Sequence, residues 1–214
     1  MTALAIHPLT PERWDDFVQL FETDSMCRMC WCLAHRLPPP VRKEMKGDVR
    51  KKHMAKVVKA GPPPGLLAYR NGEAVGWLAI APRPATPEFN IGRKASAVID
   101  DADADDPAVW AATCFFVRKD TRGSGVTGQL LEAGAAWAKA NGASRLEGCP
   151  MSHEEKRSTA GMFVGPKRVF DRQGFDTVIE RKPGRPLMRL SLDKRGKTGA
   201  KAPLPAKSGK RPAR

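Results

Sequence analysis

The centre of the sequence runs Trp110-Ala111-Ala112-Thr113-Cys114-Phe115-Phe116-Val117 and then Arg118-Lys119-Asp120-Thr121-Arg122-Gly123-Ser124-Gly125-Val126-Thr127-Gly128. The first part is an uninterrupted apolar and β-branched run, which is typical of a strand buried on both faces. From Gln129 to Asn141 the apolar residues have helical spacing, and Asn141-Gly142 is a helix stop. A helix that begins in a glycine-rich turn points free N–H groups and its positive dipole end at one place. The stretch therefore predicts an anion site.

The residues on either side predict a mixed α/β chain. Amphipathic spacing predicts a helix over 11–21 and another over 41–59, and the second holds eight Lys and Arg against two acids between Arg42 and Lys59. Asn71-Gly72 between apolar runs predicts a hairpin of strands 65–70 and 73–80, because Asn-Gly supplies the positive φ angles of a tight turn. Further strands are expected over 145–149, 175–181 and 186–192, with a short helix over 166–173.

The charge of the chain is unevenly distributed. The 214 residues carry a net charge of +14, of which +8 falls in residues 194–214 and +6 in residues 1–193. The last 21 residues contain no aromatic residue and one Leu, so they cannot bury enough surface to offset the entropy of ordering. We expect one folded domain over 1–193 and a disordered basic tail over 194–214. The tail is either a solubilising extension or an arm that binds polyanions weakly.

The apolar runs, the N-terminal residues and the cysteines also indicate in which cellular compartment the protein is located. No apolar run approaches the roughly 20 residues that a membrane-spanning helix needs, and the N-terminus does not resemble a secretory signal. Five cysteines, three of them within six residues, do not resemble a disulfide scaffold. We therefore expect a cytoplasmic protein that makes no contact with membranes.

The glycine-rich turn departs from the common nucleotide motifs, because no Gly-Lys-Ser/Thr follows it and the full Gly-x-Gly-x-x-Gly is missing. In its context, Arg122-Gly123-Ser124-Gly125-Val126-Thr127 resembles motif A of the GNAT superfamily, the GCN5-related N-acetyltransferases, with Thr127 in place of a final Gly or Ala. The segment Val169 to Phe175, which ends in Gly174-Phe175, is similar to motif B of that family. The order of elements from Pro11 to Leu192 also resembles this fold. The resemblance implies an α/β fold with a mixed, mostly antiparallel central sheet flanked by helices, and a splayed central strand pair.

The resemblance further implies a binding mode for acetyl-CoA, the expected co-substrate. The pantetheine arm would lie in the gap beside the central strand, and the pyrophosphate would bind the main-chain amides of the turn. A main-chain N–H near Cys114 to Phe116 would polarise the thioester carbonyl. The cofactor-binding residues expected on this basis are Phe115, Phe116, Val117, Arg122, Gly123, Ser124, Gly125, Val126, Thr127, Gly128 and Phe170.

The usual catalytic side chains of the family are missing. The position of its tyrosine acid aligns with Phe170, and that of its glutamate base falls near Ala111. Glu147, on the strand that flanks the gap, and His153, in the following loop, are the candidate catalytic residues. The alternatives are that Glu147 pairs with Arg145 or a backbone group and that His153 is a surface residue. A minor alternative is an acyl intermediate on Cys114.

Two other clusters raise the question of a metal. Cys27, Cys30, Cys32 and His35 are four soft ligands in nine residues, but a lone Cys-x-x-Cys usually needs a second pair to hold zinc. We interpret these thiols as packing or pocket-lining groups. The acidic run from Asp100 to Asp106 lacks the regular ligands of a calcium loop and is expected to be a solvated loop. No metal is expected.

The leading hypothesis is an acetyl-CoA-dependent N-acetyltransferase that transfers the acetyl group to a primary amine of a small molecule or protein by direct attack. One alternative is a non-catalytic acyl-CoA-binding or regulatory module. Another is a nucleic-acid-associated protein that acts through its basic tail. A homodimer is also compatible with the sequence, and the acceptor is not specified by it.

Overall fold

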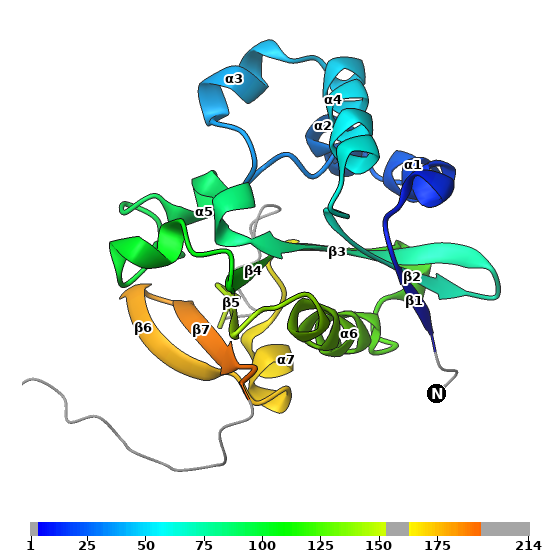
Figure 1. Cartoon of the computed structure of the whole chain (residues 1–214). Helices are drawn as coiled ribbons and strands as arrows, with labels where there is room; N and C mark the ends of the chain where they lie inside the picture. Colours follow the sequence, from blue (N-terminus) through cyan, green and yellow to red (C-terminus); the bar gives the residue numbers. More distant parts are fainter. Residues whose placement is uncertain (1–3, 153–162, 194–214) are drawn as a thin grey trace, which may run out of the picture.

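A computed structural model describes residues 4–152 and 163–193 of the chain. Within these residues the strands form one seven-stranded sheet in the order β1-β2-β3-β4-β5-β7-β6 (Figure 1). Neighbouring strands are antiparallel except for β4 and β5, which are parallel. The strands are β1 (Ala5–Pro8), β2 (Gly65–Arg70), β3 (Glu73–Pro82), β4 (Val109–Val117), β5 (Arg145–Gly148), β6 (Asp176–Lys182) and β7 (Arg185–Ser191). The α/β class and the mixed, mostly antiparallel sheet predicted from the sequence are confirmed.

Helices cover both faces of the sheet. α6 packs on β2, β3 and β4 on one face, and α1 packs on β3 on the other, beside α2 and α4 (Figure 1). The helices are α1 (Trp14–Glu22), α2 (Ser25–Cys30), α3 (Pro39–Glu44), α4 (Gly47–Ala60), α5 (Pro87–Asn90), α6 (Val126–Ala140) and α7 (Lys167–Arg172). Short 3-10 helices η1 (Pro11–Arg13), η2 (Arg83–Ala85), η3 (Asp101–Ala104) and η4 (Lys119–Thr121) lie between them. None of the helices in the described ranges is both long and apolar enough to cross a membrane.

The sheet therefore separates two main cores. The core under α6 contains Leu78, Phe115 and Leu130, and α7 adds Phe170 to it. The core under α1, α2 and α4 is aromatic, with the Phe17 and Phe21 rings 4.0 Å apart between centroids and the Trp77 ring edge-on to both. Residues of β3 and β4 contribute to both cores in alternation, as expected of strands buried on both faces.

The two central strands part after a short pairing. β4 pairs with β3 along most of its length, but with β5 only from Val109 to Ala112. At the same point Thr113 is an extra residue in β4, because Ala79 pairs with Cys114 and Ile80 pairs with Ala112. Main-chain groups alternate between the two edges of a strand. Within the described part of the chain, the main-chain N–H and C=O groups of residues 113–117 that point away from β3 therefore have no paired strand beside them. This arrangement matches the predicted splayed strand pair.

Several elements confirm the sequence predictions. The hairpin forms with Asn71 at φ 51° and Gly72 at φ 83°, as a tight turn of this kind requires. The strand before the glycine-rich turn and the helix after it are both present, although the helix begins at Val126 rather than Gln129. The first helix, the short helix near 166–173 and the last strands also lie where expected.

Three predictions of secondary structure were incomplete or wrong. β1 and α2 were not predicted, because four residues of alternating burial and a six-residue helix give weak patterns. Asp24 begins α2 by accepting N–H groups from Met26 and Cys27 at 2.9 and 3.3 Å. The helix predicted over 41–59 is two helices, since Met45 and Lys46 have extended backbones and interrupt it.

Close packing of α6 on the sheet gives a test of the fold. A Cβ atom on Gly134 would lie 2.7 Å from Leu78 Cδ2 and 3.2 Å from Ile80 Cδ1. We expect Gly134→Ile to lower the free energy of unfolding by about 1–3 kcal/mol, because the added atoms overpack this contact. The matched control is Ala136→Ile on the exposed side of the same helix, and urea denaturation measures both. Equal stability of the two variants would contradict the packing described.

Candidate acetyl-CoA and acceptor sites beside the splayed strand

The glycine-rich turn forms one wall of an open cleft of about 230 Å³. Gly123 and Gly125 have φ angles of 80° and 82°, which favour glycine, and α6 begins directly after Gly125. A Cβ atom on Gly123 or Gly128 would meet nothing within 4 Å, so the main chain at the helix start is open to a ligand. This arrangement suits the binding of a phosphate group.

Most of the predicted cofactor residues line this cleft. They are Val117, Arg122, Gly123, Gly125, Val126, Thr127 and Gly128. Ser124 does not line it, because its hydroxyl group donates to the main-chain oxygen of Thr121 at 2.6 Å and accepts from Arg70 at 2.9 Å. Phe116 lines a second cavity on the other face of β4. Phe115 and Phe170 belong to the core under α6.

The opposite wall of the cleft comes from α7 and was not predicted. Pro166, Arg168, Val169 and Arg172 face the glycine-rich turn across the cleft. Arg168 and Arg172 are one helical turn apart and so lie on the same side of α7, and Arg122 adds a third guanidinium group. Guanidinium groups suit the recognition of phosphate oxygens. The four-residue spacing of Arg168 and Arg172, which begins one residue before the motif B segment, is the signal that could have indicated them.

Phe170 lies at the fork between β4 and β5. Its side chain is fully buried, its ring centroid is 6.0 Å from that of Phe115, and a Cβ atom on Gly148 would lie 2.3 Å from its Cε1. The ring thus contacts both strands where they part, and this contact requires a glycine on β5. The predicted role of Phe170 in cofactor binding stays a prediction.

A larger cavity of about 550 Å³ lies on the α2 side of β4. Thr113, Cys114 and Phe116 form its floor, and α2 with the segment after it forms one wall. Trp31 and Cys32 in that wall have left-handed backbones, with φ angles of 44° and 53°, which side-chain-bearing residues rarely adopt. The buried indole N–H of Trp77 donates to Cys32 Sγ at 2.6 Å and holds this segment against β3.

The candidate metal ligands all line this larger cavity. Cys27, Cys30, Cys32 and His35 do so together with Cys114. Burial raises the pKa of the thiols of Cys27, Cys30 and Cys32, which favours the protonated form over the thiolate that binds metal. Among the residues described, no group of three or more His, Cys, Asp or Glu side chains is arranged to hold a metal ion.

His35 is held neutral by its surroundings. Burial is the main cause that lowers its pKa to about 4, and the nearby charges of Lys94, Arg42 and Arg185 lower it further, against a smaller opposite effect of Glu88. Its Nδ1 atom is buried and has no hydrogen-bond partner in the described part of the chain. The imidazole contacts the Phe89 ring edge-on, at 5.4 Å between centroids.

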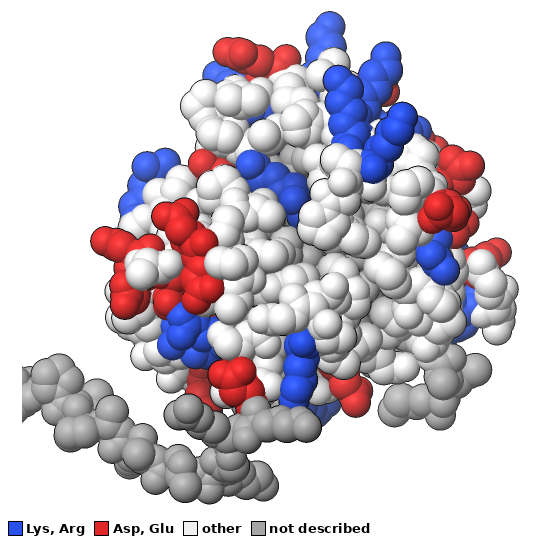
Figure 2. All heavy atoms as spheres, in the orientation of Figure 1, with Lys and Arg blue, Asp and Glu red and all other residues white. Residues whose placement is uncertain are grey.

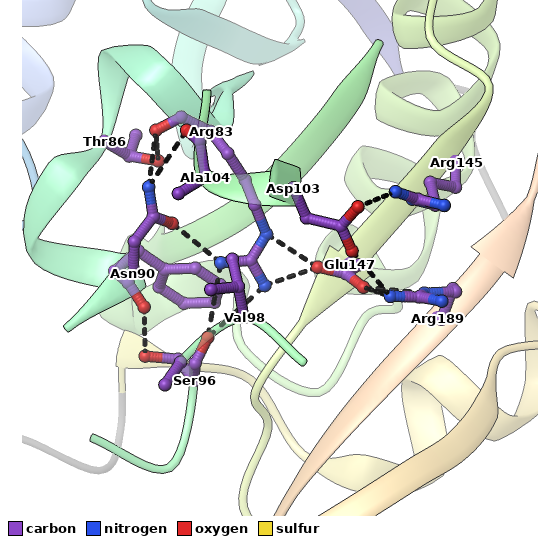
Figure 3. Close-up of polar contacts among 12 residues, drawn as sticks. Arg83, Thr86, Asn90, Ser96, Val98, Asp103, Ala104, Arg145, Glu147 and Arg189 are labelled. Atoms are coloured by element: carbon purple, nitrogen blue, oxygen red, sulfur yellow. Dashed lines mark hydrogen bonds and ion pairs between the residues drawn. The ribbon is translucent and has the colours of Figure 1, made fainter. Parts of the chain in front are cut away.

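Glu147 lies at the centre of a buried ionic network (Figure 3). Its side chain is 1% exposed and pairs with Arg83 on one side and Arg189 on the other. Arg83 Nε donates to Glu147 Oε2 at 2.6 Å, and Arg189 Nε donates to Oε1 at 2.6 Å. Arg189 also lies 3.4 Å from Asp103, which pairs with Arg145. The expected ion pair of Glu147 is thus present, but with Arg83 and Arg189 rather than Arg145.

The network fixes one wall of the larger cavity. Arg83 also donates to Asn90 Oδ1 at 2.7 Å and to the main-chain oxygen of Ser96 at 3.3 Å, and Ser96 lines the cavity (Figure 3). Arg181 donates to the main-chain oxygens of Ala97 and Val98 at 2.7 and 2.8 Å. The connection from β3 to β4 is therefore tied to β5, β6 and β7 by arginine side chains. Sequence reasoning missed this role of Arg83, because its partners are distant in sequence.

Of the two candidate catalytic residues, the structure describes only Glu147. Both carboxylate oxygens of Glu147 are paired with guanidinium groups, and Glu147 does not line either cavity. These contacts support a structural role, and its catalytic role stays a prediction. His153 lies outside the described residues.

The acidic run was expected to be a solvated loop, and this prediction was wrong for part of it. Asp103 is buried and pairs with Arg145 and Arg189, because its side chain points toward β5 and β7 from η3. Asp100 and Asp106 accept main-chain N–H groups of Ala102 and Ala108. Figure 2 shows one dense group of acidic side chains at the left of the visible face and smaller groups at its top, right and lower edges, while Lys and Arg side chains project over α4 at the upper right.

The fold and the cleft together define an α/β protein in which helix α6 begins at an open cleft beside a splayed strand pair. Residues 14–159 match the Acetyltransferase (GNAT) family. The chain belongs to this family, which supports acyltransferase activity in general and confirms the resemblance found from the sequence. No curated protein is similar enough in sequence to count as a relative.

Solved structures share this fold at low sequence identity. An N-acetyltransferase from Staphylococcus aureus Mu50 has a TM-score of 0.51 and 14% identity, and covers 90% of this chain and 100% of its own. The protein yncA from Salmonella typhimurium, solved with its cofactor acetyl-CoA, has a TM-score of 0.50 and 14% identity, and covers 93% and 99%. The loading GNATL domain of CurA from Lyngbya majuscula has a TM-score of 0.52 and 10% identity, and covers 89% and 98%.

The buried network predicts a large effect of one substitution. Glu147→Gln keeps the shape of the side chain but leaves Arg83 buried without a counter-charge. We expect the free energy of unfolding to fall by about 3–5 kcal/mol, as measured by urea denaturation. Glu132→Gln, on the exposed face of α6, is the control and should change stability by less than about 0.5 kcal/mol. A Glu147→Gln protein as stable as the control would rule out the network as a source of stability.

His35 gives a prediction for pH. The folded protein holds His35 neutral down to about pH 4, whereas the unfolded chain protonates it near its ordinary pKa of 6.5. The unfolded state therefore binds the extra proton between these values, and stability falls as the pH falls through this window. From pH 7.5 to pH 5 we expect His35 to account for about 2 kcal/mol of lost stability. In urea denaturation, the free energy of unfolding of His35→Gln should fall between pH 7.5 and pH 5 by about 2 kcal/mol less than that of the wild type. An equal fall in the two proteins would show that His35 does not cause this pH dependence.

Proposed function

We propose that this protein is an N-acetyltransferase that uses acetyl-CoA as donor and acetylates a primary amine by direct attack. The observation that carries the proposal is the position of the two cavities along β4. Val117 lines the cleft at the glycine-rich turn, while Thr113, Cys114 and Phe116 line the larger cavity on the other face. At about 3.3 Å per residue, residues 114 and 117 are about 10 Å apart. A donor bound along the edge of β4 could thus present its thioester to an acceptor in the larger cavity.

The cleft supports a role in binding the pyrophosphate of acetyl-CoA. The main-chain N–H groups at the start of α6 and the side chains of Arg122 and Arg172 suit its oxygens. The edge of β4 over residues 113–117 offers main-chain groups to the pantetheine arm. One N–H of this edge would donate to the thioester oxygen as it gains negative charge.

The chemical step needs little from side chains. The neutral amine attacks the carbonyl carbon of the thioester, the C–N bond forms as the C–S bond breaks, and the proton lost by the nitrogen ends on coenzyme A as the free thiol. A thiolate is a good leaving group and needs little help from an acid. The absence of tyrosine at Phe170 and of glutamate at Ala111 is therefore compatible with catalysis by positioning.

Gly128 gives the sharpest test of the donor site. It lies in the first turn of α6 with open space at its Cβ position, so Gly128→Leu adds a side chain to the cleft without straining the backbone. We expect this variant to fold as the wild type does and to bind acetyl-CoA at least about 30-fold more weakly, because the side chain excludes the phosphate. Isothermal titration calorimetry measures the affinity and thermal unfolding checks the fold.

The control is Ala136→Leu, which adds the same side chain on the exposed face of α6. It should bind acetyl-CoA with wild-type affinity. Unchanged affinity of Gly128→Leu would remove the donor site from this cleft. Tight binding of acetyl-CoA by the wild type without release of coenzyme A for any amine would instead favour a non-catalytic acyl-CoA-binding module.

A further inference from the structure

The charged side chains described in the lining of the larger cavity are all positive. Five of its lining side chains are cations, namely Arg42, Arg50, Lys94, Lys182 and Arg185, and none of the described residues that line it is Asp or Glu. The cations come from α3, α4, the connection between β3 and β4, and the end of the β6–β7 hairpin. Positive charge thus surrounds the cavity from several elements rather than from one.

Most of this charge is not neutralised by acidic side chains. Arg42, Arg50 and Arg185 donate to main-chain oxygens of Leu37, Arg42 and Pro150 respectively, and these neutral acceptors leave the positive charge in place. Lys182 forms no ion pair with any residue in the described ranges. Lys94 is the exception, since it pairs with Glu88 at 2.7 Å. Burial is the main cause that lowers the pKa of His35, and the charges of Lys94, Arg42 and Arg185 lower it further because all three lie near the imidazole.

Most of the other residues that line the larger cavity are apolar, and its volume is that of a small-molecule site. Met26, Met29, Phe116 and Phe163 provide apolar and polarisable surface next to the cations. A volume of about 550 Å³ lies within the usual range of about 300–1,000 Å³ for small-molecule sites. The cavity thus suits a compact molecule with an apolar body and a negative charge.

Resting on the function proposed above, we infer that the acceptor is a small primary amine that also carries a carboxylate, such as an apolar α-amino acid. The carboxylate binds among the cations, the apolar side chain contacts the methionine and phenylalanine side chains, and the amine faces the edge of β4. Polyamines and other polycations are repelled by the same potential. The positive potential also lowers the pKa of the acceptor's ammonium group, which increases the fraction of neutral amine.

The test compares matched acceptors at saturating acetyl-CoA. L-Phenylalanine, L-phenylalaninamide and 2-phenylethylamine share an aromatic body and a primary amine but differ in the carboxylate. Release of coenzyme A gives kcat and KM for each, with spermidine as the polycation. We expect kcat/KM to be at least about tenfold higher for phenylalanine than for the amide and the amine, and lowest for spermidine. Equal or higher values for the acceptors that lack a carboxylate would overturn the inference and leave the proposed function intact.

Lys182→Gln locates the effect in the cavity. Lys182 is exposed and forms no ion pair with a described residue, so its replacement should not disturb folding. We expect KM for phenylalanine to rise about fivefold, because one of the cations that bind its carboxylate is removed. KM for 2-phenylethylamine should stay the same or fall, because its ammonium group is repelled less, and the Kd of acetyl-CoA should not change. Lys139→Gln, an exposed lysine of α6 that lines neither cavity, is the control. An identical KM for phenylalanine in the two variants would place carboxylate recognition elsewhere and overturn the inference.

Direct binding separates failure of the inference from failure of the proposed function. Phenylalanine and its amide are titrated calorimetrically into the protein loaded with coenzyme A. Preferential binding of phenylalanine without turnover would support the cavity's selectivity and contradict the transferase. Binding of neither compound, together with no turnover on them, would overturn the inference, and turnover on other amines would then decide the proposed function.

Discussion

The parting of β4 from β5 is the constraint on which the rest of the structure depends. A strand in the middle of a sheet normally uses the main-chain groups of both its edges, yet β4 pairs with β5 only as far as Ala112. The extra residue Thr113 is a β-bulge that shifts the register with β3 at the same point. A bulge bends the strand, so β4 bends there while it stays paired with β3. Packing maintains the gap, since the Phe170 ring contacts Phe115 on β4 and lies against Gly148 on β5.

This constraint also explains why the two cavities occur where they do. The cleft at the glycine-rich turn and the larger cavity lie on either side of one strand, β4. Phe21 and Phe116 of the aromatic core also line the larger cavity. The two walls of the larger cavity are held by different means. Trp77 and the left-handed pair Trp31 and Cys32 position the first wall. Arg83 and Arg181 position the second through main-chain oxygens of residues 96–98.

Local patterns predicted the parts of the structure that depend on nearby residues. The apolar run before Val117, the Asn71-Gly72 turn and the glycine-rich turn each have a cause within a few residues, and all three are present. The break at Met45 was missed because the helical spacing continues through it. The arginine network was missed because Arg83, Glu147 and Arg189 are 42 or more residues apart, and only the fold brings their charges together. The positive charge of the larger cavity was equally hidden, since its cations come from separate elements.

The burial of the Arg83–Glu147 pair has a consequence for the response to ionic strength. Dissolved ions screen charges that are in contact with solvent, but they have little effect on a pair whose side chains are 0% and 1% exposed. Lys182, which lines the larger cavity, is exposed and therefore subject to screening. Added salt should therefore weaken the attraction of the cavity for anions while its walls keep their shape. Anion binding and the stability of the cavity walls both depend on arginine or lysine side chains. An increase in salt concentration nevertheless affects the first and not the second.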